Sequence, residues 1–150
     1  MMNMIFQFEN GLEIQKTRIS TEVIRSGFYV DHIDANLPTK SRHATVGFHR
    51  LGLPEILVRG VPFDCAQQAL SGLFLAAQIG LAELATGSRL DELFDREVYF
   101  TNISHELKKT EFLASRLYHE HWNFDVLEMC LGQIQRKGFE SATTSSYAVS

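Results

Sequence analysis

HATVGFHRLGLPEILVRGVP, residues His43 to Pro62, places two apolar runs on either side of the corner Leu51-Gly52-Leu53-Pro54. Apolar and β-branched runs that are bounded by glycine and proline are typical of strands. We therefore predict one strand over Ala44 to His49 and a second over Glu55 to Arg59, joined as a hairpin. In this interpretation the glycines and the proline set the backbone geometry of the corner, and the β-branched residues fill the sheet.

Residues 1–15 are predicted to form a second hairpin, which extends the domain at its N-terminus. A three-residue loop, Glu9-Asn10-Gly11, pairs Phe8 with Leu12 and Phe6 with Ile14, so that apolar residues face each other. It also puts the glycine where a left-handed residue is favoured. The lead-in "MMNMIFQFENG" lacks the basic and apolar regions of a signal peptide, and none is expected.

Helices are predicted at three places in the rest of the chain. Ile19, Val23 and Ile24 share a helical stripe that Gly27 ends. Apolar residues recur at helical spacing from 64 to 84, where Asp64 and Gln67 form a capping-box pattern. A third helix is expected from residue 104, a serine that can cap it, to about residue 118.

Further strands are predicted over FYVDHI (28–33), EVYFTNI (97–103) and FDVLEMCL (124–131), and residues 141–150 are predicted to be a flexible tail. Strands outnumber helices, and hairpins require antiparallel pairing. We therefore predict an α+β fold, a single domain over residues 16–140. Its mixed, mostly antiparallel sheet carries helices packed mainly on one face.

Composition narrows the class of protein. The chain has 150 residues, 45% of them hydrophobic and 21% charged, which fits one globular domain. A net charge of −4 argues against nucleic acid as a partner. Cys65 and Cys130 lie far apart and form no metal-type motif, so reduced thiols and a cytoplasmic location are expected. The apolar run 69–84 is interrupted and too short to span a membrane.

The strings IRSGFYVDHI, ATVGFHRLGLPEILVRGVP, REVYFTNI and FDVLEMCL follow one another in an order that resembles the DUF4262 family, a domain of unknown function. The specific part is the hairpin signature, which this chain matches at Thr45, Val46, Gly47, Pro54, Glu55, Ile56 and Gly60. The family's tyrosine is replaced by Ala44, and its tryptophan-proline-aspartate segment by CLGQIQ. The resemblance implies a fold and a bacterial or phage origin, but it assigns no activity. We expect no cofactor.

Glu55 is the acid with the strongest claim to a role, because it follows the proline at the hairpin corner. Its carboxylate could accept backbone N–H bonds from the turn or take part in binding; both readings stay open. Cys65 lies in the first helical turn, where a thiol can be activated, or is simply a buried structural cysteine. The chain has no nucleophile elbow and no phosphate-binding glycine loop, so the presence of a catalytic centre stays uncertain and is disfavoured.

His119 and His121 flank Glu120 and could bind zinc or iron with a third ligand from His43, His49 or His105. Alternatively, they belong to a polar helix end. We commit to no metal, with this pair as the alternative.

Our leading hypothesis is a small protein-interaction module that is an inhibitor, immunity or regulatory protein and binds another protein or a second copy of itself. The alternative is an enzyme or small-ligand binder with its site at the Gly47–Gly60 hairpin. Candidate binding residues are Thr45, His49, Glu55, Tyr118 and Trp122.

Overall fold

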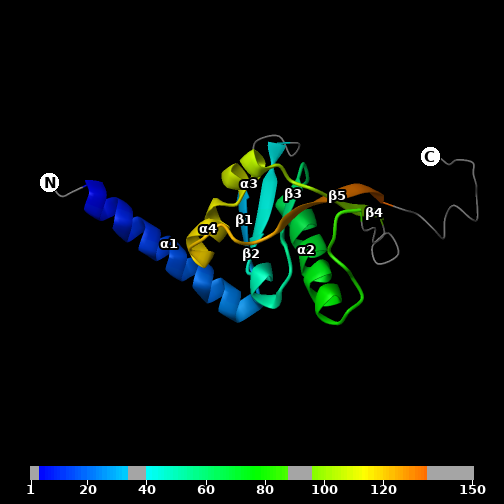
Figure 1. The fold of residues 1–150 in the computed structure, drawn as a ribbon, viewed down its shortest axis with the longest axis horizontal. Coiled ribbons are helices and arrows are strands. Elements are labelled where there is room, and N and C mark those ends of the chain that lie inside the picture. The colour runs from blue at the N-terminus through cyan, green and yellow to red at the C-terminus, as the bar shows by residue number, and fades with distance from the viewer. Residues whose placement is uncertain (1–3, 34–39, 88–95, 135–150) are drawn as a thin grey trace, which may run out of the picture.

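The computed structural model describes residues 4–33, 40–87 and 96–134. Along the chain, the elements are α1 (Met4–Ser26), β1 (Tyr29–Ile33), β2 (Arg42–Val46), the 3₁₀ turn η2 (Phe48–Leu51), β3 (Glu55–Arg59), α2 (Phe63–Gln78), β4 (Arg96–Thr101), α3 (His105–Glu111), α4 (Leu113–His119) and β5 (Val126–Ile134). The sheet lies at the centre of the molecule, and α1 extends well beyond it (Figure 1). No helix in the described residues combines the length and apolar character that crossing a membrane requires.

One sheet of five strands, in the order β1-β2-β3-β5-β4, spans the described part of the chain. β1 and β3 both run antiparallel to β2, and β4 runs antiparallel to β5. The β3–β5 pair is parallel, and the chain from α2 through α4 supplies the long crossover that a parallel pair requires. The predicted single-domain α+β fold with a mixed, mostly antiparallel sheet is confirmed.

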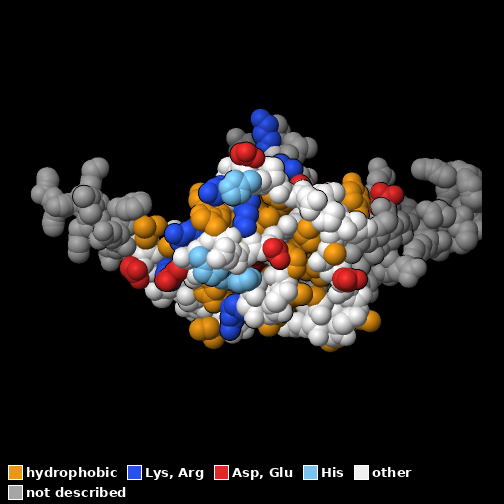
Figure 2. Space-filling view, in the orientation of Figure 1, with side chains coloured by type: hydrophobic (Ala, Val, Ile, Leu, Met, Phe, Trp, Pro, Cys, Tyr) orange, Lys and Arg blue, Asp and Glu red, His pale blue; other side chains and the backbone are white. Residues whose placement is uncertain are grey.

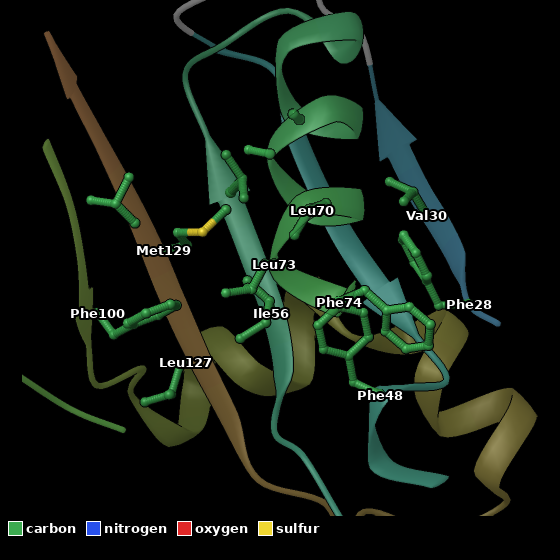
Figure 3. Packing of buried hydrophobic residues seen from close by; sticks show 14 residues of the cluster. Phe28, Val30, Phe48, Ile56, Leu70, Leu73, Phe74, Phe100, Leu127 and Met129 are labelled. Carbon is green, nitrogen blue, oxygen red and sulfur yellow. The ribbon is translucent and has the colours of Figure 1, made fainter. Parts of the chain in front are cut away.

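Alternate residues of β3 face opposite sides of the sheet and show which helices cover each side. Ile56 and Val58 belong to the same buried cluster as Leu70 and Leu73 of α2. Figure 3 shows Ile56 close to Leu70 and Leu73 among the other buried apolar side chains. Leu57 lies on the other side, in the layer that α1, α3 and α4 cover. Three of the four helices of the described chain thus share one face, as expected, and α2 alone covers the other.

The predicted N-terminal hairpin is wrong, because α1 runs without a break through the expected turn at Asn10 and Gly11. An isolated two-stranded hairpin is only marginally stable. By contrast, Ile19 and Val23 are fully buried against the body, and helix growth is cooperative once such a segment is fixed. Open space surrounds the position of a Cβ on Gly11, so the glycine costs this helix only its propensity, roughly 1 kcal/mol.

Several other predicted boundaries shift. The first strand of the opening hairpin ends at Val46, three residues early, because Gly47 has a φ of +122° and leaves the extended region. A Cβ there would lie 3.2 Å from the carbonyl oxygen of Gly27, so the close approach of the two backbones requires glycine. The strand over Glu55 to Arg59 is confirmed to the residue. Gly27 ends α1 as expected, although Ile24 is exposed.

The helices also depart from their predicted ends. α2 stops at Gln78 rather than at residue 84, and no side-chain hydrogen bond caps its start, so the capping box is wrong. The Ser104 cap is confirmed, because its hydroxyl accepts from the backbone N–H of Leu107 at 3.1 Å. That helix breaks at Phe112 into α3 and α4. The predicted tail, 141–150, lies outside the described residues.

Candidate functional site

A fully buried carboxylate lies at the hairpin corner. After Gly47 turns the chain, η2 begins, and successive backbone N–H groups of Gly47, Phe48 and His49 donate to the Glu55 carboxylate at 2.9, 3.1 and 3.2 Å. Consecutive N–H groups in such a turn form a concave site for anions. Glu55 enters it from the start of β3, with no solvent-exposed surface.

Two side chains complete the binding of the carboxylate. The Thr45 hydroxyl donates to Oε1 of Glu55 at 2.7 Å and accepts from the backbone N–H of Ile56 at 2.8 Å. Nε2 of His119 lies 2.8 Å from Oε2 of Glu55, and because a carboxylate accepts, this nitrogen carries the proton and donates. The His119 side chain is only 5% exposed. We call these groups together the Glu55 nest.

The Glu55 nest leaves the carboxylate little chemical freedom. An ionised carboxylate offers about four lone-pair sites, and the Glu55 nest aims five donors at them. A general base or a metal ligand needs an open lone pair that a substrate or ion can reach. Of the two readings of Glu55, the structure confirms that it accepts backbone N–H bonds from the turn.

Three histidines gather outside the Glu55 nest. The ring of His49 lies edge-on to His119 at 5.0 Å and to His121 at 6.0 Å, and His119 and His121 stack at 6.0 Å between ring centroids. Nδ1 of His121 accepts from the backbone N–H of Asn123 at 3.0 Å. Figure 2 shows histidine side chains gathered at this place on the surface, between α4 and η2.

The metal alternative gains no support from this gathering. Within residues 4–33, 40–87 and 96–134, no group of three or more His, Cys, Asp or Glu side chains is placed to hold a metal ion. His119 and His121 each commit one ring nitrogen to a protein partner. Three of the candidate binding residues do lie together, because the Glu55 carboxylate accepts from the Thr45 hydroxyl and from the backbone N–H of His49.

The aromatic candidates play packing roles. Tyr118 is partly buried beside the contact of α1 with α4, and its ring lies 5.0 Å from that of His119. Trp122 stacks on Phe124 at 6.0 Å, and the ammonium of Lys109 lies 5.7 Å from the centroid of its ring. Both rings therefore pack against other side chains, and each is partly buried.

His43 and Cys65 lie apart from the Glu55 nest. His43 is fully buried and donates through Nε2 to the carbonyl oxygen of Val61 at 2.8 Å, which leaves its Nδ1 without a partner in the described residues. Cys65 is half-buried, and its sulfur accepts from the guanidinium of Arg96 at 3.3 Å. Neither residue belongs to the group formed by His49, His119 and His121.

Sequence reasoning missed a groove of about 490 Å³ beside β1. It lies between α1 and α2, and each helix lines it with residues at a spacing of four, a pattern that could have been noticed. In the apolar helix α2 the polar pair Gln67 and Ser71 is the clearer signal. We call this the β1 groove; its lining residues are Arg18, Glu22, Ser26, Phe28, Tyr29, Val30, His32, Phe63, Gln67 and Ser71.

Electrostatics in the β1 groove are set by a few groups. Arg25 and Ser26 hydrogen-bond to the Glu22 carboxylate, and these bonds lower the pKa of Glu22. Burial raises the pKa of the Tyr29 phenol, with a smaller contribution from the negative charge of Asp31. At neutral pH, Glu22 is therefore ionised but already engaged, and Tyr29 is neutral.

The fold and the Glu55 nest define a class: a small, single-domain α+β protein whose hairpin corner closes over a buried glutamate. The model of one family, described as "Domain of unknown function (DUF4262)", matches residues 22–134. The chain therefore belongs to the DUF4262 family. No curated protein and no solved structure matches it.

Proposed function

We propose that this protein is a binding module for another protein, without a catalytic centre of its own, and that the β1 groove is its binding surface. The observation that carries the proposal is the groove itself, about 490 Å³ beside an edge strand and lined by both polar and aromatic side chains. Pockets that combine apolar walls with a few polar groups are typical binding sites.

The hydrogen bonds of Glu55 support the part of the proposal that assigns no catalytic centre. It is the acid that the hairpin corner offers for chemistry, and its lone pairs are taken by the turn, Thr45 and His119. We further propose a cytoplasmic location and a bacterial or phage origin, as the family resemblance and the cysteine content imply. An inhibitor, immunity or regulatory role needs a recognition surface and no reaction centre, so it fits this architecture.

A photo-crosslinking amino acid at Gln67, inside the β1 groove, tests the proposal in cells that encode the protein. The matched control carries the same amino acid at Gln68, which is exposed on α2 and does not line the groove. We expect a discrete adduct with one protein from position 67 and far less of it from position 68. Equal adducts from both positions, or none from either, would refute the groove as the binding surface.

We propose small-ligand binding at the histidines as a second candidate function, because His121 is exposed and its ring lies 6.0 Å from that of His49. Elemental analysis of the purified protein decides its metal version. Stoichiometric zinc or iron that disappears when His119 and His121 are replaced by alanine would support it.

A further inference from the structure

We propose that the β1 groove takes an extended peptide segment, which adds to the free edge of β1 as a further strand and presents an acidic side chain to Arg18. This inference rests on the proposed binding function and names the form and charge of the segment that is bound. Such strand addition uses main-chain hydrogen bonds for affinity and pockets for alternate side chains for specificity.

β1 lies at one edge of the sheet, where another strand can be added. β1 is an outer strand of the sheet, and within the described residues it pairs with β2 alone. In an antiparallel pair, alternate residues point their N–H and C=O groups away from the partner strand, so the outer side of β1 presents a row of groups that no strand of the described residues pairs with. Figure 3 shows β1 at one edge of the sheet, with Phe28 and Val30 pointing toward α2.

Helices α1 and α2 form the two walls of the β1 groove. A new strand lies about 4.8 Å from the strand it joins, and its side chains alternate between the two sides of the sheet. Beside β1, one side meets the α1 wall with Arg18 and Glu22, and the other meets the α2 wall with Phe63, Gln67 and Ser71. The β1 groove therefore offers both a backbone edge and two different walls, which is what an extended segment needs.

The charges on the α1 wall indicate which side chain the bound segment presents there. Arg18 is exposed at the groove and makes no ion pair within the described residues. Glu22 on the same wall is already engaged by Arg25 and Ser26. Among the described residues that line the α1 wall, Arg18 therefore carries a positive charge without an ion-pair partner, and an aspartate or glutamate at the facing position of the segment would match it.

On the α2 wall, the ring of His32 packs on Phe63 at 4.2 Å between centroids, and the Gln67 amide donates to the Ser71 hydroxyl at 3.3 Å. This surface suits a small or polar side chain.

A second copy of the chain is a poorer occupant. Two β1 strands paired antiparallel about their middle residue would bring Asp31 directly opposite Asp31 of the other copy. Like charges directly opposite each other destabilise a sheet, and a charged residue on an edge strand is a common device against self-pairing. We therefore assign the groove to a segment of a different protein.

The test starts from selection of a random library of displayed peptides, each about eight residues long, long enough to cover a typical strand. We expect selected peptides to share an acidic residue and to bind in extended form. Replacement of Arg18 by glutamate should weaken their binding about tenfold or more, and an Asp-to-Lys change in the peptide should restore it. Arg50→Glu is the matched control, because Arg50 is exposed on η2 outside the β1 groove.

N-methylation of the peptide backbone, one amide at a time, tests the strand itself. Methyl groups at alternate amides should abolish binding, and those between should have little effect, because only alternate N–H groups face β1. The same peptides should protect the amides of Tyr29–Ile33 from hydrogen exchange.

Three results would each overturn the inference. The effect of N-methylation could fail to alternate along the peptide, the selected peptides could lack an acidic residue, or the protein could form a dimer in which the β1 amides are protected. Adducts at Gln67 alongside any of these results would leave the broader binding proposal standing. Loss of the Gln67 adducts would remove both.

Discussion

Replacing Glu55 by glutamine tests the Glu55 nest with almost no change in shape. The substitution keeps one carbonyl oxygen, but it turns the other oxygen into an NH₂ group. Each oxygen of Glu55 accepts at least one backbone N–H, from Gly47, Phe48 or His49. Whichever way the glutamine amide is oriented, its NH₂ group must therefore face donors instead of accepting from them.

The magnitude follows from the contacts. The oxygen that is lost accepts two or three hydrogen bonds in the Glu55 nest, depending on the orientation of the amide. A buried donor left without an acceptor costs about 1–3 kcal/mol. Some relaxation of the turn reduces the sum, so we expect the free energy of unfolding to fall by about 3–5 kcal/mol, as when a buried ion pair loses one partner. That is a large share of the 5–15 kcal/mol typical of a domain.

Urea unfolding, followed by circular dichroism and by the fluorescence of the single tryptophan, Trp122, measures this difference. Glu83→Gln is the control, because Glu83 is exposed, and a surface change of this kind stays within about 0.5 kcal/mol. Thr45→Val is a milder second variant, which keeps the measurement possible if Glu55→Gln does not fold. A loss below about 1 kcal/mol for Glu55→Gln would refute the structural role of the carboxylate.

Three further results are expected. His119→Phe removes one charged hydrogen bond from Glu55 and should cost about 1–3 kcal/mol of unfolding free energy, measured by urea titration; no loss would contradict the contact. Gly47→Ala should cost more than Gly52→Ala in thermal unfolding, because both have positive φ but only the Cβ at Gly47 would meet backbone, at 3.2 Å; equal costs would contradict this. Burial raises the pKa of Tyr29 from its ordinary value of 10.0, so its stabilising contribution is complete below that pH and is lost as pH rises through the raised pKa. Tyr29→Phe should therefore lose less stability between about pH 9 and pH 11 than the parent protein; an equal loss would argue against the shift.

The central strands were predictable because their signals are local. Glu55 to Arg59 is an apolar run between a proline and a glycine, and the strand has those bounds. The first half of α1 was missed because Asn10 and Gly11 favour a turn only locally, whereas the stripe of Ile19 and Val23 that Gly27 ends was predicted. What decides the outcome is the burial of Ile19 and Val23, which depends on a surface formed by distant parts of the chain.

Part of the candidate site could also be predicted from local sequence signals, and part of it could not. That Glu55 could accept N–H bonds from its own turn was one of two readings open from the sequence, because the donors lie within eight residues of it. The contact with His119 spans 64 residues and could not be inferred from spacing. The sequence offered a signal for each wall of the β1 groove, the residues spaced by four on α1 and on α2, but it could not show that the two walls meet, because β1, β2 and β3 separate the two helices in the sequence.

The Glu55 nest also bears on the order in which the protein folds. Its bonds to Thr45 and to the turn join residues six to ten positions apart, so they can close while the rest of the chain is still unfolded. The bond to His119 cannot close until α4 has returned to the sheet, after a loop of 64 residues. We therefore expect mutations at Thr45 to slow folding and mutations at His119 chiefly to speed unfolding. One carboxylate would then report on both the first and the last stage of assembly.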